Sequence, residues 1–177
     1  SLIKANAIRK KSYRNKQKCL FLDRDNTLIK CHKNEYIISI NQVEFITNNI
    51  YKISKIREQY DLAIIVTNQP QIAMGLVDWP TVISINSFVI EKCLNLGLKI
   101  DSFNLCPHHY DSGFKKEVSQ LKQDCFCRKP KPGLILQEAL SRNIDLKNSL
   151  MIGDHVNDEI AALRAGCKFK YIDNLTT

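Results

Sequence analysis

Residues 21–29, FLDRDNTLI, place two aspartates one residue apart, directly after a short apolar run. Asp23 and Asp25 are followed at once by Asn26 and Thr27. Two carboxylates this close repel each other, which raises at least one pKa unless a cation neutralises them. Mg²⁺ suits that role, because it prefers oxygen ligands and commonly binds substrate phosphate as well. One aspartate after a strand often only caps a turn, but the pair with a nearby threonine indicates a functional site.

The rest of the chain alternates between apolar runs and segments with helical spacing. Residues 62–66, LAIIV, form a continuous run of the kind that is buried on both faces of a parallel sheet. The predicted strands are residues 18–22, 62–66, 100–105, 149–153 and 168–172, and the predicted helices are residues 47–59, 79–96, 133–143 and 158–166. In the second helix the expected inward side chains are Val82, Ile83, Ile85, Phe88, Val89 and Leu94. This alternation predicts an α/β fold, a doubly wound, Rossmann-like parallel sheet.

Polar residues follow several of the predicted strands. In doubly wound sheets, ligands bind beyond the carboxyl ends of the strands. Asp23, Thr67 and Asp154 each stand at such an end. We therefore expect three segments that are distant in the sequence to converge at one edge of the sheet.

The net charge of +8 is concentrated at the start of the chain. Residues 1–18 contain no acidic side chain and hold the basic residues Lys4, Arg9, Lys10, Lys11, Arg14, Lys16 and Lys18. Because these account for most of the excess, they indicate a basic N-terminal arm or linker, and we expect no nucleic-acid partner. The predicted division is an arm over residues 1–18 and a domain over residues 19–177. If the arm is a linker, another domain precedes it.

The expected location is cytoplasmic. No apolar run approaches the roughly 20 residues that cross a membrane, and the basic start lacks the apolar core of a signal peptide. We expect a monomer with no membrane partner. The seven cysteines are an odd number, which argues against a disulfide framework and favours reduced thiols, some of them on a metal.

Four metal-ligating side chains lie in two close pairs within the polar loop 106–127. Cys106 and His108 are separated by one residue, and after sixteen further residues Cys125 and Cys127 are again separated by one. Three thiolates and one imidazole suit tetrahedral Zn²⁺ with no open position, which is typical of a structural site. The sequence leaves open whether His109 replaces His108. A nucleic-acid zinc finger is the rival interpretation, but its ligands are usually spaced CxxC.

Residues 23–27, DRDNT, resemble the first motif, DxDxT, of the haloacid dehalogenase (HAD) superfamily of phosphatases. Three further motifs of that superfamily follow in the same order. Thr67 ends the second predicted strand, Lys129 precedes a predicted helix, and residues 153–158 match GDxxxD. The resemblance covers about residues 18–172 and implies a HAD fold.

This resemblance implies hydrolysis of a phosphate monoester through an aspartyl-phosphate. Asp23 would be the nucleophile, and Asp25 would protonate the leaving alcohol and then deprotonate the attacking water. Thr67 and Lys129 would hold the phosphoryl oxygens. Mg²⁺ would bind the Asp23 carboxylate, the Asp25 backbone carbonyl and the Asp154 carboxylate.

The stretch CPHH…CxCRKPxPG, residues 106–133, resembles the D,D-heptose 1,7-bisphosphate phosphatase and histidinol-phosphate phosphatase subgroup. There a zinc loop acts in place of a larger cap domain, and the spacing of the motifs leaves no room for a large cap here. The resemblance implies that Arg128 contacts a distal phosphate or a sugar hydroxyl, and that Asn68 contacts the sugar. Lys129 and Tyr36 are expected to complete the substrate contacts.

Several positions differ from the heptose enzymes. Gln71 and Met74 stand where Gly and Arg are expected, Glu35 where Gly is typical, and His155 where Lys is common. These positions face the substrate in that subgroup, so the resemblance does not fix the substrate. Asp158 is expected either to support the site or to bind the metal.

Three interpretations remain open. The favoured one is a Mg²⁺-dependent phosphatase that acts on a small sugar phosphate, a heptose bisphosphate of surface-polysaccharide (lipopolysaccharide) precursor synthesis. The second is a histidinol-phosphate phosphatase. The third is a non-catalytic, zinc-stabilised module of a larger bifunctional protein, and the costly set of polar residues expected at one edge of the sheet argues against it.

Overall fold

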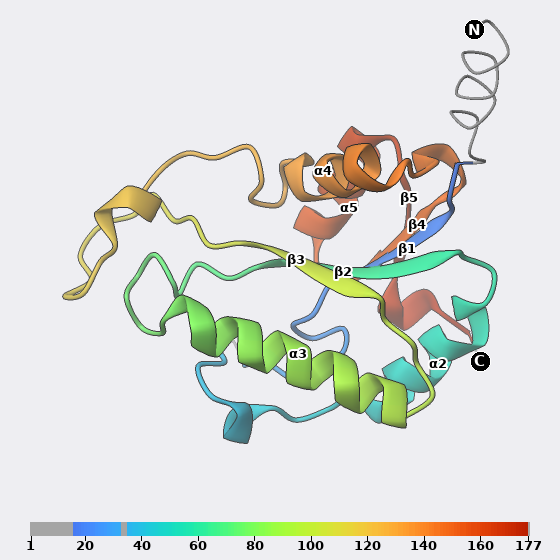
Figure 1. Cartoon of the computed structure of the whole chain (residues 1–177), viewed down its shortest axis with the longest axis horizontal. Coiled ribbons are helices and arrows are strands. Elements are labelled where there is room, and N and C mark those ends of the chain that lie inside the picture. Colours follow the sequence, from blue (N-terminus) through green and yellow to red (C-terminus); the bar gives the residue numbers. More distant parts are fainter. Residues whose placement is uncertain (1–15, 33–34, 177) are drawn as a thin grey trace, which may run out of the picture.

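The computed structural model describes residues 16–32 and 35–176 of the chain. Its centre is a five-stranded parallel sheet in the order β3-β2-β1-β4-β5 (Figure 1). The strands are β1 (Cys19–Leu22), β2 (Leu62–Asn68), β3 (Ser102–Cys106), β4 (Leu150–Gly153) and β5 (Lys168–Tyr171). The order reverses between β1 and β4, which is the switch point at which doubly wound sheets bind ligands. The predicted fold class is therefore confirmed.

Helices cover both faces of the sheet, with α2 and α3 on one side and α4 and α5 on the other (Figure 1). Their bounds are α2 (Thr47–Arg57), α3 (Trp79–Asn95), α4 (Gly133–Arg142) and α5 (Val156–Ala165). Short 3₁₀ turns lie at η1 (Ile40–Gln42), η2 (Ser119–Leu121), η3 (Leu146–Asn148) and η4 (Ile172–Asn174). In the described part of the chain, no helix combines the length and the apolar character needed to cross a membrane.

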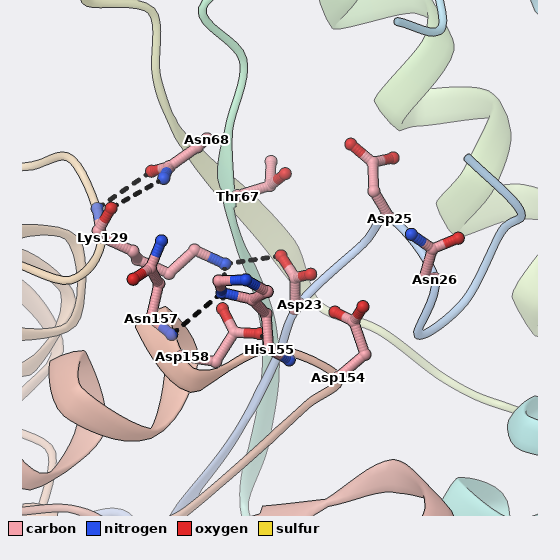
Figure 2. A pocket seen from close by; sticks show the side chains of 10 residues that line it. All are labelled: Asp23, Asp25, Asn26, Thr67, Asn68, Lys129, Asp154, His155, Asn157 and Asp158. Carbon is pink, nitrogen blue, oxygen red and sulfur yellow. Dashed lines mark hydrogen bonds and ion pairs between the residues drawn. The ribbon is translucent and has the colours of Figure 1, made fainter. Parts of the chain in front are cut away.

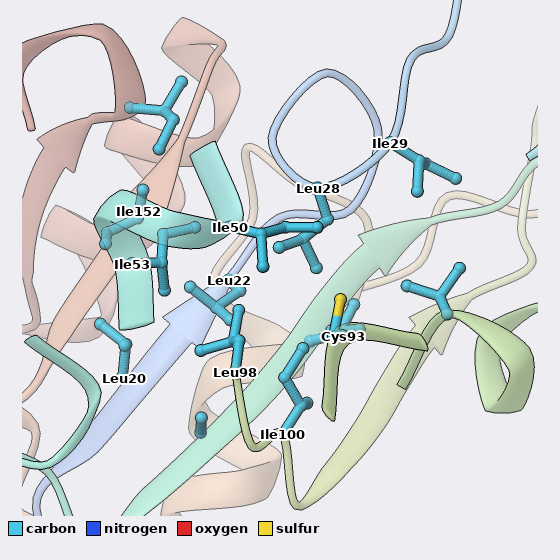
Figure 3. Close-up of a cluster of buried hydrophobic side chains, with 14 of the residues drawn as sticks. Leu20, Leu22, Leu28, Ile29, Ile50, Ile53, Cys93, Leu98, Ile100 and Ile152 are labelled. Atoms are coloured by element: carbon cyan, nitrogen blue, oxygen red, sulfur yellow. The ribbon is translucent and has the colours of Figure 1, made fainter. Parts of the chain in front are cut away.

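Alternate residues of β1 and β2 pack into two separate cores. Leu20 and Leu22 belong to the cluster beneath α2 and α3, where Figure 3 shows them beside Ile50 and Ile53. Phe21 instead packs into the cluster on the α4 and α5 side. Because side chains alternate across a strand, a continuous apolar run fills both cores at once. Burial on both faces holds the carboxyl end of β1 in a fixed place.

Two helices differ from the sequence prediction. Ile83 and Leu94 of α3 were predicted to face inward, but 39% and 57% of their surfaces are exposed. The inner face of this helix is completed by Asn86 and Cys93, which are fully buried. The last helix begins two residues earlier than predicted, because His155 caps it, accepting a hydrogen bond from a backbone N–H of the first turn.

The connection between β3 and α4 contains the 3₁₀ turn η2 and is otherwise irregular, and no large cap domain is present among the described residues. Most of the predicted basic arm, residues 1–15, lies outside the described residues. Gln17 exchanges backbone hydrogen bonds with Asn143 and Asp145. The division of the chain at residue 18 stays a prediction.

Truncation of the core strand should destabilise the domain strongly. Leu22 is completely buried, so Leu22→Ala should lower the free energy of unfolding by about 2–5 kcal/mol. Leu140→Ala is the control, because 87% of Leu140 is exposed and its loss should change stability by less than about 0.5 kcal/mol. Urea unfolding followed by circular dichroism measures both, and equal costs would contradict the packing described above.

Candidate active site

The predicted polar residues meet at the carboxyl ends of β1, β2 and β4, around a pocket of ≈ 240 Å³ (Figure 2). The side chains that line it are Asp23, Asp25, Asn26, Thr67, Asn68, Lys129, Asp154, His155, Asn157 and Asp158. They come from the ends of the strands, from the segment before α4 and from the start of α5. The expected convergence at one edge of the sheet is therefore observed.

Asp23 lies at the base of this pocket, directly after β1. Its backbone N–H donates to the carbonyl oxygen of Ile152 at 2.9 Å, which continues the pairing of β1 with β4. The residue is only 7% exposed, and this burial raises the pKa of its carboxyl. Lys129 opposes the rise, whereas the carboxylates of Asp158 and Asp25 add to it. The site therefore favours a cation beside Asp23.

Lys129 supplies one such charge from within the protein. Its Nζ lies 2.5 Å from Oδ1 of Asp23 and 2.7 Å from Oδ1 of Asp158. Burial alone would lower the pKa of Lys129, but the two carboxylates outweigh it and raise the pKa above its ordinary value. The ammonium therefore remains charged in a nearly closed environment.

Asn68 fixes the backbone of Lys129. Its Nδ2 donates to the carbonyl oxygen of Lys129 at 3.0 Å, and its Oδ1 accepts from the backbone N–H of the same residue at 3.0 Å. Both bonds are visible in Figure 2. Asn68 was expected to contact the sugar, and the structure shows that its amide also positions Lys129. One amide N–H remains available to a substrate, because an Asn amide carries two.

Asp158 supports Lys129 from the first turn of α5. One of its oxygens contacts the ammonium, and Oδ2 accepts from the backbone N–H of His155 at 3.1 Å. A Cβ at Gly153 would lie 2.4 Å from Oδ2 of Asp158, so only glycine permits this approach of β4 to α5. The glycine and the second aspartate of the GDxxxD motif are thus parts of one contact.

Three carboxylates could hold a metal ion here. Oxygens of Asp23, Asp154 and Asp158 lie within 4.8 Å of one another. Asp154 is an exposed residue, but its carboxylate is partly desolvated in the pocket, which together with Asp158 raises its pKa. A cluster of oxygen ligands suits a hard cation such as Mg²⁺.

The chain reverses just after Asp25 in a tight turn. Asn26 has φ 59°, a left-handed conformation that asparagine adopts more readily than most residues. Its side-chain oxygen accepts from the backbone N–H of Cys31 at 2.9 Å, and Leu28 N–H donates to the carbonyl oxygen of Arg24 at 2.9 Å. Leu28 therefore returns to the core while Asp25 stays at the pocket.

Sequence reasoning missed Arg24, which lies between the two aspartates and is completely buried. Its Nε donates to Oδ1 of Asp25 at 2.8 Å, and Nη2 donates to Oδ2 at 3.1 Å. Its Nη1 donates to Oδ1 of Asn86 in α3 at 2.9 Å. Asp25 therefore has its own cation, separate from the one that pairs with Asp23. The sequence feature that could have revealed this role is the position of Arg24, between two aspartates just beyond the carboxyl end of a buried strand.

The four residues of the predicted zinc site also come together. Ligand atoms of Cys106, His108, Cys125 and Cys127 lie within 4.8 Å of one another, and His108 Nδ1 is 3.2 Å from Cys127 Sγ. Hydrogen bonding to Cys106 lowers the pKa of Cys127, which favours the thiolate that binds metals. The neighbouring His109 instead accepts a bond from the backbone N–H of Asp111. This geometry favours His108 as the ligand.

This cluster is joined to the pocket through a short stretch of backbone. Arg128 follows Cys127 directly and donates from Nη1 to the carbonyl oxygen of His108 at 3.1 Å. A second pocket, of ≈ 540 Å³, adjoins the first at Lys129 and is lined by Tyr110, Asp124, Arg128, Lys129, Pro130, Lys131 and Arg164. Tyr36 is half-buried and, within the described chain, is not among the side chains that line either of these pockets.

Comparison with known proteins finds a consistent set of relatives. A model of the HAD-hydrolase-like family matches residues 126–172. The chain is 35% identical over 154 residues to D-glycero-beta-D-manno-heptose-1,7-bisphosphate 7-phosphatase of Pasteurella multocida, covering 87% of this chain and 79% of the relative. It is 36% identical over 161 residues to D-glycero-alpha-D-manno-heptose-1,7-bisphosphate 7-phosphatase of Photorhabdus laumondii, covering 86% and 80%.

A solved structure agrees with these relatives. The D,D-heptose 1,7-bisphosphate phosphatase of B. bronchiseptica, complexed with magnesium and phosphate, aligns with a TM-score of 0.70 and 27% identity. The alignment covers 86% of this chain and 78% of that chain.

The contact between Lys129 and Asp158 provides a test of the pocket. Asp158→Asn keeps the shape but removes the charge, so the rate of phosphate release should fall about 10–100-fold, as is typical when a supporting partner is lost. Glu159→Gln is the matched control, because that neighbouring carboxylate bonds Tyr171 instead. A phosphate-release assay at saturating Mg²⁺ measures both, and equal rates would show that Asp158 does not position Lys129.

Proposed function

Because the chain belongs to the HAD phosphatase family that contains the heptose bisphosphate phosphatases, we propose that it is a Mg²⁺-dependent hydrolase of the 7-phosphate of a D-glycero-D-manno-heptose 1,7-bisphosphate. One observation carries the proposal: Asp23, Lys129 and Asp154 line a single pocket at the carboxyl edge of the sheet. Relatives named for the alpha and the beta substrate both match, so either anomer fits the proposal.

The proposed chemistry uses the two aspartates in sequence. Asp23 attacks phosphorus and forms an aspartyl-phosphate, while Asp25 gives a proton to the leaving alkoxide. Asp25 then takes a proton from the water that hydrolyses the intermediate and restores Asp23. The Asp25 carboxylate pairs with Arg24 and not with Lys129, which suits it to a role separate from that of Asp23.

The phosphoryl group is held by donors that the structure leaves available. An ammonium has three N–H donors, and the two contacts of Lys129 with Asp23 and Asp158 leave one for a phosphoryl oxygen. We assign the Thr67 hydroxyl, which lines the same pocket, to a second oxygen. Positioning and charge neutralisation are the main requirements of phosphoryl transfer.

The Asp23 and Asp154 carboxylates, with the Asp25 backbone carbonyl, are the residues that would hold Mg²⁺. When bound, the ion supplies positive charge against the phosphoryl oxygens and the clustered carboxylates. Asp158 belongs to the same carboxylate cluster, and we assign it to the support of Lys129.

The adjoining pocket favours a substrate with a second anionic group. Arg128, Lys131 and Arg164 line it, and Lys129 joins it to the catalytic pocket. A bisphosphate could thus place its transferred phosphate at Asp23 and its other phosphate near these cations. Histidinol phosphate, the alternative substrate, has no second phosphate to use them. A cytoplasmic location, a monomeric state and a domain preceding the chain remain predictions.

A substrate panel tests this function. Purified protein with Mg²⁺ should release phosphate from a heptose 1,7-bisphosphate with a higher kcat/KM than from histidinol phosphate or sugar monophosphates, and EDTA should abolish release. Asp23→Asn should reduce kcat by more than about 10³-fold, because it removes the nucleophile. Glu58→Gln, an exposed change after α2, should leave kcat unchanged.

The outcomes separate the alternatives. Preference for histidinol phosphate would replace the proposed substrate and keep the chemistry. Full activity of Asp23→Asn would remove the nucleophile assignment. A wild-type protein that folds, binds Mg²⁺ and releases no phosphate from the whole panel would support a non-catalytic module.

We further propose that the four-residue Cys/His cluster binds structural Zn²⁺. Elemental analysis should find about one zinc per chain, and Cys125→Ser should lose it and lower the Tm by more than about 5 °C, because closed zinc sites contribute to folding. Cys31→Ser is the control, since Cys31 lies outside the cluster. Retention of zinc and Tm in Cys125→Ser would contradict the assignment.

A further inference from the structure

Gln69 lies between two of the polar side chains that line the catalytic pocket. It follows β2 directly and is completely buried, and its backbone N–H donates to the carbonyl oxygen of Cys106 at 2.8 Å. Among the described residues, its side chain is not one of those that line the pocket. Gln69 can therefore orient the residues of the pocket without touching a substrate there.

All sides of the Gln69 amide are engaged. Its Nε2 donates to Thr67 Oγ1 at 2.8 Å and to Asp25 Oδ2 at 3.2 Å. Its Oε1 accepts from Nε2 of Gln71 at 2.5 Å. If the Gln69 amide were flipped, its Oε1 would face the Asp25 carboxylate and its Nε2 would face the N–H donor of Gln71. The network therefore holds the two N–H groups toward Thr67 and Asp25.

The bond from Gln69 determines what the Thr67 hydroxyl can do. A hydroxyl has one hydrogen to donate and lone pairs to accept with. Because Oγ1 of Thr67 accepts from Gln69, its own hydrogen is free to point into the pocket. This is the direction needed to donate to a phosphoryl oxygen.

The same amide makes the two oxygens of Asp25 unequal. Oδ2 accepts from both Arg24 Nη2 and Gln69 Nε2, at 3.1 Å and 3.2 Å. Among the described residues, Oδ1 accepts only from Arg24 Nε, at 2.8 Å. Since a carboxylate oxygen accommodates about two donors, Oδ1 retains a free lone pair. Oδ1 is thus the oxygen suited to exchange a proton with the leaving group or with water.

We propose that Gln69 is a positioning residue that aims both the Thr67 hydroxyl and the Asp25 carboxylate for phosphoryl transfer. This rests on the proposed function, in which these two groups contact the phosphoryl group and the leaving oxygen. Gln69 touches neither, so it acts through them. The proton that Asp25 delivers to the leaving alkoxide comes from Oδ1, while Oδ2 stays bound to Arg24 and Gln69.

The test compares two buried polar side chains, one beside the pocket and one at the opposite edge of the sheet. Gln69→Met removes the donors to Thr67 and Asp25. Ser149→Ala removes a buried hydroxyl that bonds the backbone of Cys19 and Asp145 at the amino end of β4, away from the pocket. Each variant is assayed with two substrates. The heptose bisphosphate is the alkyl ester, and p-nitrophenyl phosphate is the aryl ester. The aryl ester matters because nitrophenolate leaves without needing a proton.

Gln69→Met should lower kcat/KM about 10²-fold for the alkyl ester and only about 10-fold for the aryl ester, because a misplaced general acid affects only the former. Ser149→Ala should stay within about threefold of wild type for both esters, because within the described chain the Ser149 hydroxyl bonds no residue of the pocket. Equal losses for the two esters, or equal losses in the two variants, would overturn the proposal, because a purely structural role makes no distinction between leaving groups.

A second variant keeps the test decisive if Gln69→Met does not fold. Gln69→Glu retains the shape of the side chain but sets a carboxylate against Asp25, and it should show the same selective loss for the alkyl ester. The activity of the wild type distinguishes a failure of the proposed function from a failure of the Gln69 proposal. If wild type hydrolyses glycerol 2-phosphate but no heptose bisphosphate, the substrate proposal fails, and glycerol 2-phosphate becomes the alkyl ester of the Gln69 comparison.

Discussion

The buried ion triad of Asp23, Lys129 and Asp158 is the interaction on which the rest of the site depends. Two carboxylates share one ammonium at 2.5 Å and 2.7 Å, so the triad carries a net negative charge when both are ionised, before Asp154 is counted. Removing one partner from a buried ion pair typically costs several kcal/mol, because an uncompensated charge is left behind. This excess negative charge favours a further cation in the pocket. The contact that holds Asp23 in place therefore also favours a metal ion beside it.

The position of Lys129 depends in turn on three parts of the fold. Asn68 at the end of β2 binds its backbone from one side, and the Cys/His cluster ends two residues before it at Cys127. From α5, Asp158 holds the side chain, through an approach that only Gly153 permits. An irregular segment thus acquires the rigidity of the strands and helices around it. The zinc proposed for the cluster would affect the chemistry through this backbone, without contact with the substrate.

The sequence predicted the sheet and the meeting of the motifs well, because continuous apolar runs and strand-end polar residues are local signals. It placed Val82, Ile85 and Val89 correctly on the buried face of α3 but drew that face too wide, since Ile83 and Leu94 are as apolar as their buried neighbours and only packing separates them. It also missed Arg24 and Gln69. Each of these polar residues has a hydrogen-bond partner more than forty positions away in the sequence. For Arg24 this partner is Asn86, and for Gln69 it is Asp25. Such pairings arise from topology, which spacing along the chain does not contain.

The structure also changes the explanation of how two neighbouring carboxylates coexist. The sequence suggested that one Mg²⁺ neutralises the pair, but the two side chains point to different places and have different cations. Asp23 faces Lys129, and Asp25 is held by Arg24, the residue between them. Because Arg24 is completely buried, its positive charge would be costly without the carboxylate of Asp25, and the guanidinium in turn neutralises that carboxylate. In the proposed mechanism, this separation allows Asp23 to serve as the nucleophile beside a metal while Asp25 exchanges protons. A site in which both faced the same ion would leave neither free for the second task.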